Sequence, residues 1–365
     1  MSAEEKYSQP LQLKDGFKAK RKLSPVRIKP YELDLSHFMN KKNSPLKKYF
    51  EFKHANKNRL FVREILGDIL NNVVTISLAD EVKKIAQNLI KLSWNSTIFI
   101  NIVDFTNVDR NVKNYYKKNI ILKENQIIDL CYATKAQSDS DEWFRSRKVR
   151  ITASSKAHKV KTCKKVTFES LADGFVKEDN ILRSEREQKS KGITALDYGK
   201  KNEPKAIENF CKLYNVKVYQ IGAFVMPAEP WLLVSTDGIV EQNENYKLLE
   251  IKCPYSCKTK PVFDESQNKC NVGYLEVVDQ KIQLKKSHMY YTQVQVSMYA
   301  TGLQSCDFFV WSKKGSCLVE VLRDNAFLSK VIPLLKKFYF SNYLQAIHKK
   351  FEETNKENVI NKSIF

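Results

Sequence analysis

The stretch "LLVSTDGIVEQNENYKLLEIKCPY", residues 232–255, combines two strand-like apolar runs with three charged side chains. The first run leads to Asp237, and the second carries Glu250 and Lys252. An ionised carboxylate in a buried strand costs on the order of several kcal/mol unless it is paired or bound to a metal. The stretch therefore predicts a functional site at the end of a sheet as well as a core.

The spacing of these residues indicates how they meet. Side chains alternate along a strand, so Glu250 and Lys252 share one face and Ile251 points to the other. If the two runs pair as a hairpin through "EQNEN" at 241–245, Asp237 and Glu250 converge at one end. Two such carboxylates repel, which raises the pKa of one of them unless a divalent cation keeps both ionised. Oxygen ligands of this kind suit Mg²⁺ or Mn²⁺.

Lys252 beside such an ion would orient an attacking water or meet a phosphate oxygen, which together with the acids describes hydrolysis of a phosphodiester. The alternative is a surface hairpin with an ordinary Glu–Lys pair, because three residue types at loose spacing also occur by chance. The pattern alone leaves both interpretations open.

Outward from this stretch, the pattern beyond residue 138 alternates between helices and strands and predicts an α/β fold: a mixed central sheet with helices on both faces. Pro204 is expected in the first turn of its helix. The expected helices are 141–147, 151–160, 170–178, 195–214, 287–302 and 325–351, and the expected strands are 216–226, 231–241, 246–252, 306–312 and 317–323.

The N-terminal third differs from the rest. Residues 1–60 hold fifteen Lys or Arg against six Asp or Glu, which predicts a flexible basic arm. Residues 61–138 have a helical period and predict a small helical region of unknown role. We expect the alternating α/β region to be one domain over 139–352, followed by a tail over 353–365. One face of the helical region is formed by Leu78, Val82, Ile85 and Leu89.

The whole chain of 365 residues has 62 Lys plus Arg against 41 Asp plus Glu, a formal charge of +21. This charge favours a polyanionic partner, nucleic acid ahead of an acidic membrane surface, although a lysine-rich soluble protein would show it too.

No apolar run approaches the roughly 18 to 20 residues that span a bilayer. The start of the chain has no secretory core, so we expect an intracellular protein, nuclear or cytoplasmic. The eight cysteines form no CxxC pair and predict free thiols rather than a zinc site.

Four motifs in order resemble the YqaJ-like viral recombinase family of PD-(D/E)xK nucleases, the family of the phage lambda exonuclease. The resemblance covers about residues 140–325 and implies a restriction-endonuclease-like core. The motifs are "EWFRSRKVRITASS" (142–155), "DYGKKNEPKAIENF" (197–210), "STDGIV" with "LEIKCP" (235–254) and "YYTQVQVSMYATG" (290–302).

The resemblance implies a role for each matching residue. Asp237 and Glu250 would hold the metal, with the carbonyl of Ile251 as a further ligand and Glu203 binding directly or through water. Lys252 would place and activate the nucleophilic water, and Gln293 would assist that water or the scissile phosphate.

A second group of matching residues, Arg147, Ser154 and Ser235, would form a pocket for a 5′-phosphate. A guanidinium gives phosphate a forked, charge-assisted contact, and two hydroxyls complete it. Trp143 is expected to be part of the core. The sequence departs from the family pattern at Thr236, which replaces a frequent proline, and at Pro204, which follows the helix acid.

These roles predict a Mg²⁺- or Mn²⁺-dependent deoxyribonuclease acting as a 5′-to-3′ exonuclease on duplex DNA ends. Recombination, repair and defence all fit such an activity. A homotrimeric ring around DNA is implied by the resemblance alone. Two alternatives stay open: a structure-dependent endonuclease on the same core, and a basic DNA-binding protein with a degenerate nuclease core.

Overall fold

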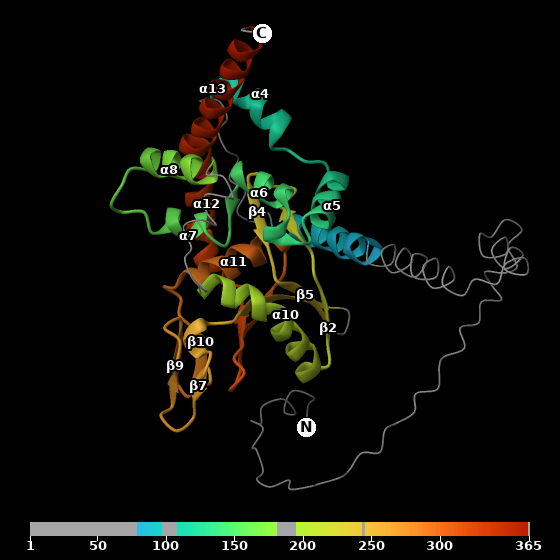
Figure 1. Ribbon diagram of the computed structural model, residues 1–365, viewed down its shortest axis with the longest axis vertical. Coiled ribbons are helices and arrows are strands. Elements are labelled where there is room, and N and C mark those ends of the chain that lie inside the picture. The colour runs from blue at the N-terminus through green and yellow to red at the C-terminus, as the bar shows by residue number, and fades with distance from the viewer. Residues whose placement is uncertain (1–78, 97–107, 181–194, 243–244, 364–365) are drawn as a thin grey trace, which may run out of the picture. The chain divides into compact units, whose positions relative to one another are not determined.

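The computed structural model describes residues 79–96, 108–180, 195–242 and 245–363, all within one compact unit, Leu70–Phe365. The predicted basic arm lies outside the described residues, as does Leu78. Mixed sheets flanked by helices confirm the predicted α/β class (Figure 1). Among the described helices, none has the length and apolar character needed to cross a membrane.

A five-stranded mixed sheet, in the order β12-β11-β6-β5-β2, forms the centre of this unit. β6 pairs antiparallel with β5, with Gly238 opposite Leu249, and parallel with β11. The predicted hairpin is thereby confirmed, and it brings Asp237 to the end of β6. The strands are β2 (Lys217–Tyr219), β5 (Gly238–Gln242), β6 (Asn245–Lys252), β11 (Ser305–Val310) and β12 (Cys317–Leu322).

A second, three-stranded sheet has the order β1-β4-β3. β1 (Ile151–Thr152) runs parallel to β4 (Leu232–Ser235), and β3 (Ala223–Val225) runs antiparallel to β4. Every residue of β3 is buried, as are the first three of β4, so this sheet lies within the core.

Three of the predicted elements are wrong in detail. The strand expected over 231–241 is two strands, because the chain leaves one sheet after β4 and enters the other at β5. The strand expected over 216–226 likewise divides into β2 and β3, and the helix expected over 151–160 begins as β1. Apolar content and period do not reveal a change of sheet, since each short run satisfies the same pattern in either sheet.

Helices α10 (Ala195–Tyr214) and α11 (Met289–Thr301) cover opposite faces of the five-stranded sheet. On one face, Phe210 of α10 packs with Leu249 and Ile251. On the other, Val294 of α11 lies in the hydrophobic cluster that contains Leu248. Alternation along β6 therefore directs Glu250 and Lys252 toward α11.

The placement of Pro204 in a first turn is wrong. Residue 204 lies in the middle of α10, which continues through it. Proline removes one backbone hydrogen bond from a helix interior and so destabilises it locally. Burial of Asn202, Ala206 and Phe210 on both sides of Pro204 offsets this cost by packing.

The N-terminal helices pack into the same hydrophobic cluster as β3 and β4. A helix over residues 79–94 buries Val82, Ile85 and Leu89 as predicted. The predicted boundary at residue 139 stays a prediction. This part also contains α4 (Arg110–Asn119), α5 (Glu124–Ala133), a 3-10 turn at Gln137–Asp139 and α6 (Asp141–Lys148).

The C-terminal helix is longer than expected and is interrupted. α12 (Asn325–Phe338) passes through a π-helical turn, Tyr339–Tyr343, into α13 (Leu344–Ser363). α13 lies beside α4, where the Tyr115 and His348 rings meet with centroids 5.5 Å apart (Figure 1). The remaining helices are α7 (Lys156–Lys161), α8 (Phe168–Asn180) and a 3-10 turn at Tyr255–Cys257.

Two small hairpins follow the turn at Tyr255–Cys257 and were not predicted. They are β7 (Phe263–Asp264) with β8 (Lys269–Cys270), and β9 (Leu275–Val278) with β10 (Lys281–Leu284).

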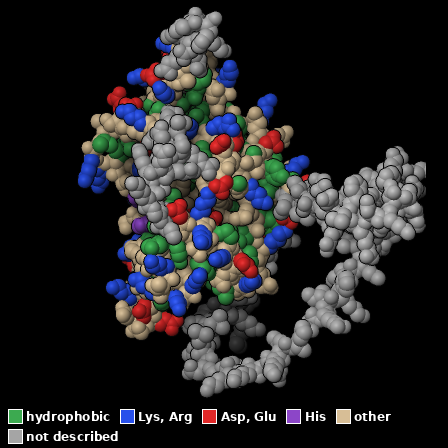
Figure 2. Space-filling view, in the orientation of Figure 1, with side chains coloured by type: hydrophobic (Ala, Val, Ile, Leu, Met, Phe, Trp, Pro, Cys, Tyr) green, Lys and Arg blue, Asp and Glu red, His purple; other side chains and the backbone are tan. Residues whose placement is uncertain are grey.

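Lysines and arginines are distributed over the face shown in Figure 2, together with acidic side chains, rather than gathered in one patch of it.

Candidate active site

Asp237 lies at the break between β4 and β5, where the chain changes sheets. Its Oδ2 accepts a hydrogen bond of 2.7 Å from the backbone N–H of Ile251. Gly238 is the first β5 residue paired with β6, so the side chain of Asp237 extends the ladder by one hydrogen bond before the backbone pairing begins. The predicted convergence of Asp237 with the end of β6 is therefore present in the structure.

Glu250 is the most deeply buried acid of the group, with 1% of its surface exposed. Its Oε1 accepts hydrogen bonds from Lys252 Nζ and, at 2.7 Å, from Gln293 Nε2 of α11. Its Oε2 is buried and has no hydrogen-bond partner among the residues that the structure describes. An unpaired buried carboxylate oxygen is costly, so this atom is suited to a ligand from outside the chain.

Glu203 approaches from α10, on the opposite face of the sheet from Gln293. Its side chain is half-buried and interacts electrostatically with Asp237, Lys252 and Lys200. Asp237 thus lies between an acid from one face and the Glu250–Lys252–Gln293 group of the other.

Burial and mutual repulsion shift the titration of these groups in a consistent direction. Burial first, and the charge of Asp237 second, raise the pKa of Glu250 to about 8 and that of Glu203 to about 7. Burial also raises the pKa of Asp237, although Lys252 and the Ile251 N–H oppose the shift. Burial lowers the pKa of Lys252, but Glu250 and Asp237 outweigh it and raise that pKa overall. The acids therefore lack enough positive charge to be ionised together at neutral pH.

The backbone carbonyl of Ile251 also faces this group. In a strand, the N–H and C=O of one residue point to the same edge, and the N–H of Ile251 points at Asp237. The carbonyl of Lys252 points the other way, because it accepts from Trp311 beyond β11. The predicted ligand oxygen of Ile251 is thus directed to the side of Asp237.

A divalent cation fits this donor set, because the buried oxygen Glu250 Oε2 would gain a partner by binding it. The described part of the chain contains no cluster of three or more His, Cys, Asp or Glu side chains arranged for a metal. Mg²⁺ does not require such a cluster, because it commonly uses one or two carboxylates and keeps several waters.

The three residues predicted to bind phosphate form a second group next to the first. Arg147 Nη2 donates to Ser154 Oγ at 3.1 Å, and Trp143 Nε1 donates to Ser235 Oγ at 2.9 Å. The Arg147 guanidinium lies 3.9 Å from the centroid of the Trp143 ring. The group adjoins the acids because Ser235 is two residues before Asp237.

The parallel pairing of β1 with β4 brings the two serines to the same end of this sheet. Ile151 is opposite Leu232 and Thr152 opposite Leu233, so Ser154 follows β1 at the end where β4 finishes with Ser235. Trp143 packs against the core, as predicted, but it also connects Arg147 with Ser235. Its hydrogen bond was not predicted, because sequence spacing does not show where an indole N–H will point.

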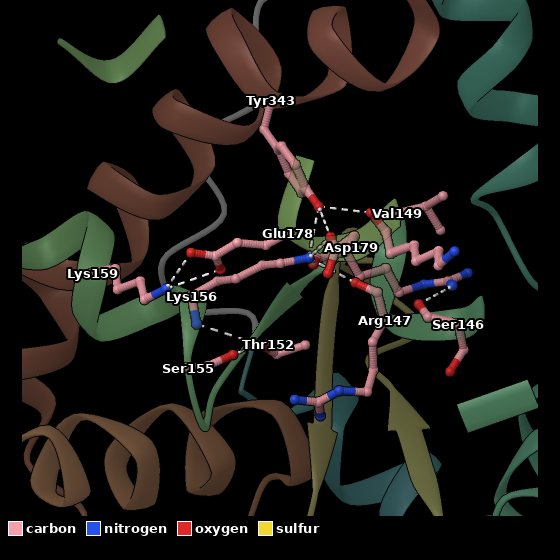
Figure 3. Close-up of polar contacts among 12 residues, drawn as sticks. Ser146, Arg147, Val149, Thr152, Ser155, Lys156, Lys159, Glu178, Asp179 and Tyr343 are labelled. Atoms are coloured by element: carbon pink, nitrogen blue, oxygen red, sulfur yellow. Dashed lines mark hydrogen bonds and ion pairs between the residues drawn. The ribbon is translucent and has the colours of Figure 1, made fainter. Parts of the chain in front are cut away.

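A buried network that the sequence did not reveal holds the end of α6, which carries Arg147 (Figure 3). Lys156 Nζ donates to the carbonyls of Arg147 at 2.9 Å and Arg150 at 3.2 Å, and to Asp179 Oδ2 at 2.6 Å. Tyr343 donates to the carbonyl of Lys148 at 2.6 Å, so carbonyls at the end of this helix receive hydrogen bonds from side chains of other elements.

A cavity of about 390 Å³ adjoins this network and the guanidinium. It combines aromatic, basic and acidic side chains. The lining residues are Trp143, Phe144, Arg147, Lys148, Ser155, Lys156, Lys159, Glu178 and Asp179.

Comparison with known proteins confirms the resemblance inferred from the motifs. Residues 142–304 match the family profile described as the YqaJ-like viral recombinase domain. That segment contains every residue of both groups described above. A comparison with curated proteins gave no match.

Among solved structures, the chain is similar to an alkaline exonuclease from Laribacter hongkongensis, with 20% identity and a TM-score of 0.40 over 60% of this chain and 99% of that one. A phage related exonuclease from Haemophilus somnus 129PT has 15% identity and a TM-score of 0.34, over 55% and 96% of the two chains. The shutoff and exonuclease protein of Kaposi's sarcoma associated herpesvirus has 12% identity and a TM-score of 0.35, over 69% and 84%.

Proposed function

We propose that this chain is a metal-dependent deoxyribonuclease that hydrolyses DNA phosphodiesters as a 5′-to-3′ exonuclease on duplex ends. The observation that carries the proposal is the environment of Glu250. Its Oε1 is held by Lys252 and Gln293, while its buried Oε2 has no partner in the described part of the chain. An ordinary surface Glu–Lys pair would be exposed and would leave no buried oxygen open. The match of residues 142–304 to the YqaJ-like domain supports the same chemistry.

Asp237, Glu250 and the carbonyl of Ile251 would hold Mg²⁺ or Mn²⁺, with Glu203 binding directly or through water. When bound, the ion supplies a Lewis acid for the phosphate and lowers the pKa of a water. The raised pKa values of Glu250 and Glu203 indicate that these sites take protons when no cation is present.

Lys252 is positioned to orient the attacking water. Its ammonium is fixed by Glu250 Oε1 and lies 4.8 Å from the centroid of the Tyr290 ring. Gln293 holds the same carboxylate from α11. These contacts fix the direction of both polar groups before substrate binds, which lowers the entropic cost of aligning the water.

The Arg147 group gives the proposed enzyme its preference for an end. The guanidinium is stacked on Trp143 and hydrogen-bonded to Ser154, with Ser235 on the other side of the indole. A terminal 5′-phosphate would receive a forked contact from Arg147 and hydroxyl contacts from the serines. This end pocket beside the acids supports the 5′-to-3′ direction. A homotrimer encircling the duplex belongs to the same proposal, and sedimentation of the intact chain tests it.

The test is digestion of 5′-phosphorylated linear duplex with Mg²⁺ or Mn²⁺, with closed circular DNA as the comparison. Wild-type protein is expected to degrade the linear form and spare the circle. Lys252→Ala and Asp237→Asn should each be at least about 100-fold slower, because the water is no longer activated or the cation no longer held.

Lys247→Ala is the matched control, because Lys247 is also on β6 but pairs with Glu320 at 2.6 Å, away from the acids. Undiminished cleavage by Lys252→Ala would contradict the assignment. Nicking of supercoiled plasmid would instead identify an endonuclease. Chelator-insensitive DNA binding without cleavage under any metal would identify a degenerate, DNA-binding core.

A further inference from the structure

A pair of tyrosines borders the acids and has no part in the proposed chemistry. Tyr198 and Tyr255 meet edge to face, with ring centroids 5.4 Å apart and planes at 86°. Tyr198 precedes Glu203 by five residues in α10, and Tyr255 follows Lys252 by three. Three residues of extended chain span at most about 11 Å, so Tyr255 lies within one or two nucleotides of Lys252.

The contact between α10 and the end of β6 fixes this pair in place. A Cβ on Gly199 would lie 4.0 Å from the carbonyl oxygen of Cys253, so the first turns of α10 lie against the residue after Lys252. Tyr198 packs on the cluster that contains Ile251 and Cys253. Core packing therefore accounts for Tyr198.

Packing does not account for Tyr255, which is 39% exposed. The Lys258 ammonium lies 4.5 Å from the centroid of its ring and 3.0 Å from its hydroxyl. Lys260 is also exposed and follows Tyr255 by five residues, whereas Lys200 of α10 is paired with Asp139 at 2.6 Å. An exposed aromatic ring beside cations, in edge-to-face contact with a second ring, is suited to bind a nucleotide by stacking and by phosphate contact.

We propose that Tyr255, supported by Tyr198 and flanked by Lys258, is a stacking platform for a base of single-stranded DNA next to the reacting phosphate. Lys258 is a flexible, exposed cation, and on binding it moves from the ring to a phosphate and leaves the ring face to the base. Stacking requires an unpaired base, so the platform takes a strand that has separated from its complement. Its role at the scissile phosphate rests on the proposed nuclease function, whereas the binding itself does not.

The experiment compares a short thymidine oligonucleotide with an abasic oligonucleotide of equal length, by fluorescence anisotropy in EDTA. Wild-type protein should bind the thymidine strand more tightly, and Tyr255→Ala should lose at least about fivefold of that preference. Tyr255→Phe should keep the preference, because the ring remains. Lys258→Ala should weaken both oligonucleotides alike and make the salt dependence shallower by about one charge.

Tyr132→Ala is the matched control, because Tyr132 is 43% exposed on α5 and lies outside both groups of site residues. Thermal unfolding of each variant confirms that it is folded. If Tyr255→Ala is not folded, Tyr255→Leu carries the test, because it removes the ring but keeps an apolar side chain. A Tyr255→Ala protein that keeps the full preference for bases overturns the platform. Failure to digest DNA with Mg²⁺, together with a base preference that depends on Tyr255, overturns the proposed nuclease and leaves the platform standing.

Discussion

At the scale of single residues, the site depends on one glutamate with two unlike oxygens. Glu250 Oε1 accepts from the Lys252 ammonium and from the Gln293 amide, which keeps the carboxylate in one orientation. Oε2 is buried and has no hydrogen-bond partner within the described ranges. Buried polar atoms are nearly always satisfied, so this carboxylate oxygen is a local sign that something else binds here.

The titration of the acids predicts how stability depends on pH. From 4.5, the ordinary pKa of a glutamate, up to about 8, folded protein binds more protons at Glu250 than unfolded protein does. The contribution of Glu250 to the free energy of unfolding is therefore fully present below pH 4.5 and is lost as the pH rises through about 8. Glu203 acts in the same direction up to about pH 7.

Thermal unfolding in EDTA across this range measures the effect. We expect the melting temperature of wild-type protein to fall relative to that of Glu250→Gln as the pH rises. Mg²⁺ should stabilise wild-type protein more at the upper end of the range, because it then displaces fewer protons. A difference between the two proteins that grows in the opposite direction would contradict the raised pKa of Glu250.

At the scale of elements, α6 presents Arg147, and distant segments hold α6. Lys156 of α7 and Tyr343 of the π-helical turn bind the carbonyls of Arg147 and Lys148. The Tyr343 hydroxyl oxygen also lies 2.9 Å from Asp179 Oδ2, so α6, α7, α8 and the C-terminal helix meet at one point (Figure 3). The end of α6, which carries the Arg147 guanidinium, is therefore held in a fixed orientation and does not fray.

Lys156→Met should weaken this support and leave Asp179 without its cation. We expect a loss of about 3 to 5 kcal/mol in the free energy of unfolding. The ratio of cleavage rates on 5′-phosphoryl and 5′-hydroxyl ends should also fall, because Arg147 is less well placed. Urea unfolding and the two digestion rates measure these effects.

Lys336→Met provides the comparison, since Lys336 is a buried lysine bound to Glu229 at 2.9 Å. It should cost a similar amount of stability and leave the end preference unchanged. Tyr343→Phe is a milder change to the network that contains Lys156. If Lys156→Met, Tyr343→Phe and Lys336→Met all have the same end preference, the network only stabilises the fold.

At the scale of the whole molecule, charge is distributed between the described unit and the N-terminal segment. Residues 1–60 carry fifteen basic against six acidic side chains, within a formal total of +21. Basic segments contribute to DNA binding mainly by releasing counterions, which makes affinity dependent on salt. The described unit would supply the site, and the basic segment would supply general affinity.

Removing residues 1–60 should therefore weaken DNA binding and make its salt dependence shallower. The rate at saturating DNA should not change, because no site residue lies in that segment. Affinity measured over a series of salt concentrations, together with cleavage at saturation, tests this division. An unchanged salt slope would show that the described unit alone makes the phosphate contacts.

The sequence by itself determined the fold class, the β5–β6 hairpin and the helices α10 and α11, because these features follow from local periodicity. Asp237, Glu250 and Lys252 could be placed together from their spacing, because a hairpin has few alternative arrangements. Gln293, Glu203 and the Arg147 group were predicted only from the family resemblance.

Only the tertiary structure decided the change of sheet at Thr236 and Asp237, the indole bond that joins Arg147 to Ser235, and the network from Lys156 to Tyr343. The contact between Tyr343 and Lys148 joins residues 195 positions apart. Local patterns carry no information on such pairs, because the same alternation or helical period is satisfied whichever distant segment packs against it. The unpartnered oxygen of Glu250 belongs to this class, since a lack of partners is a property of every segment that surrounds the atom.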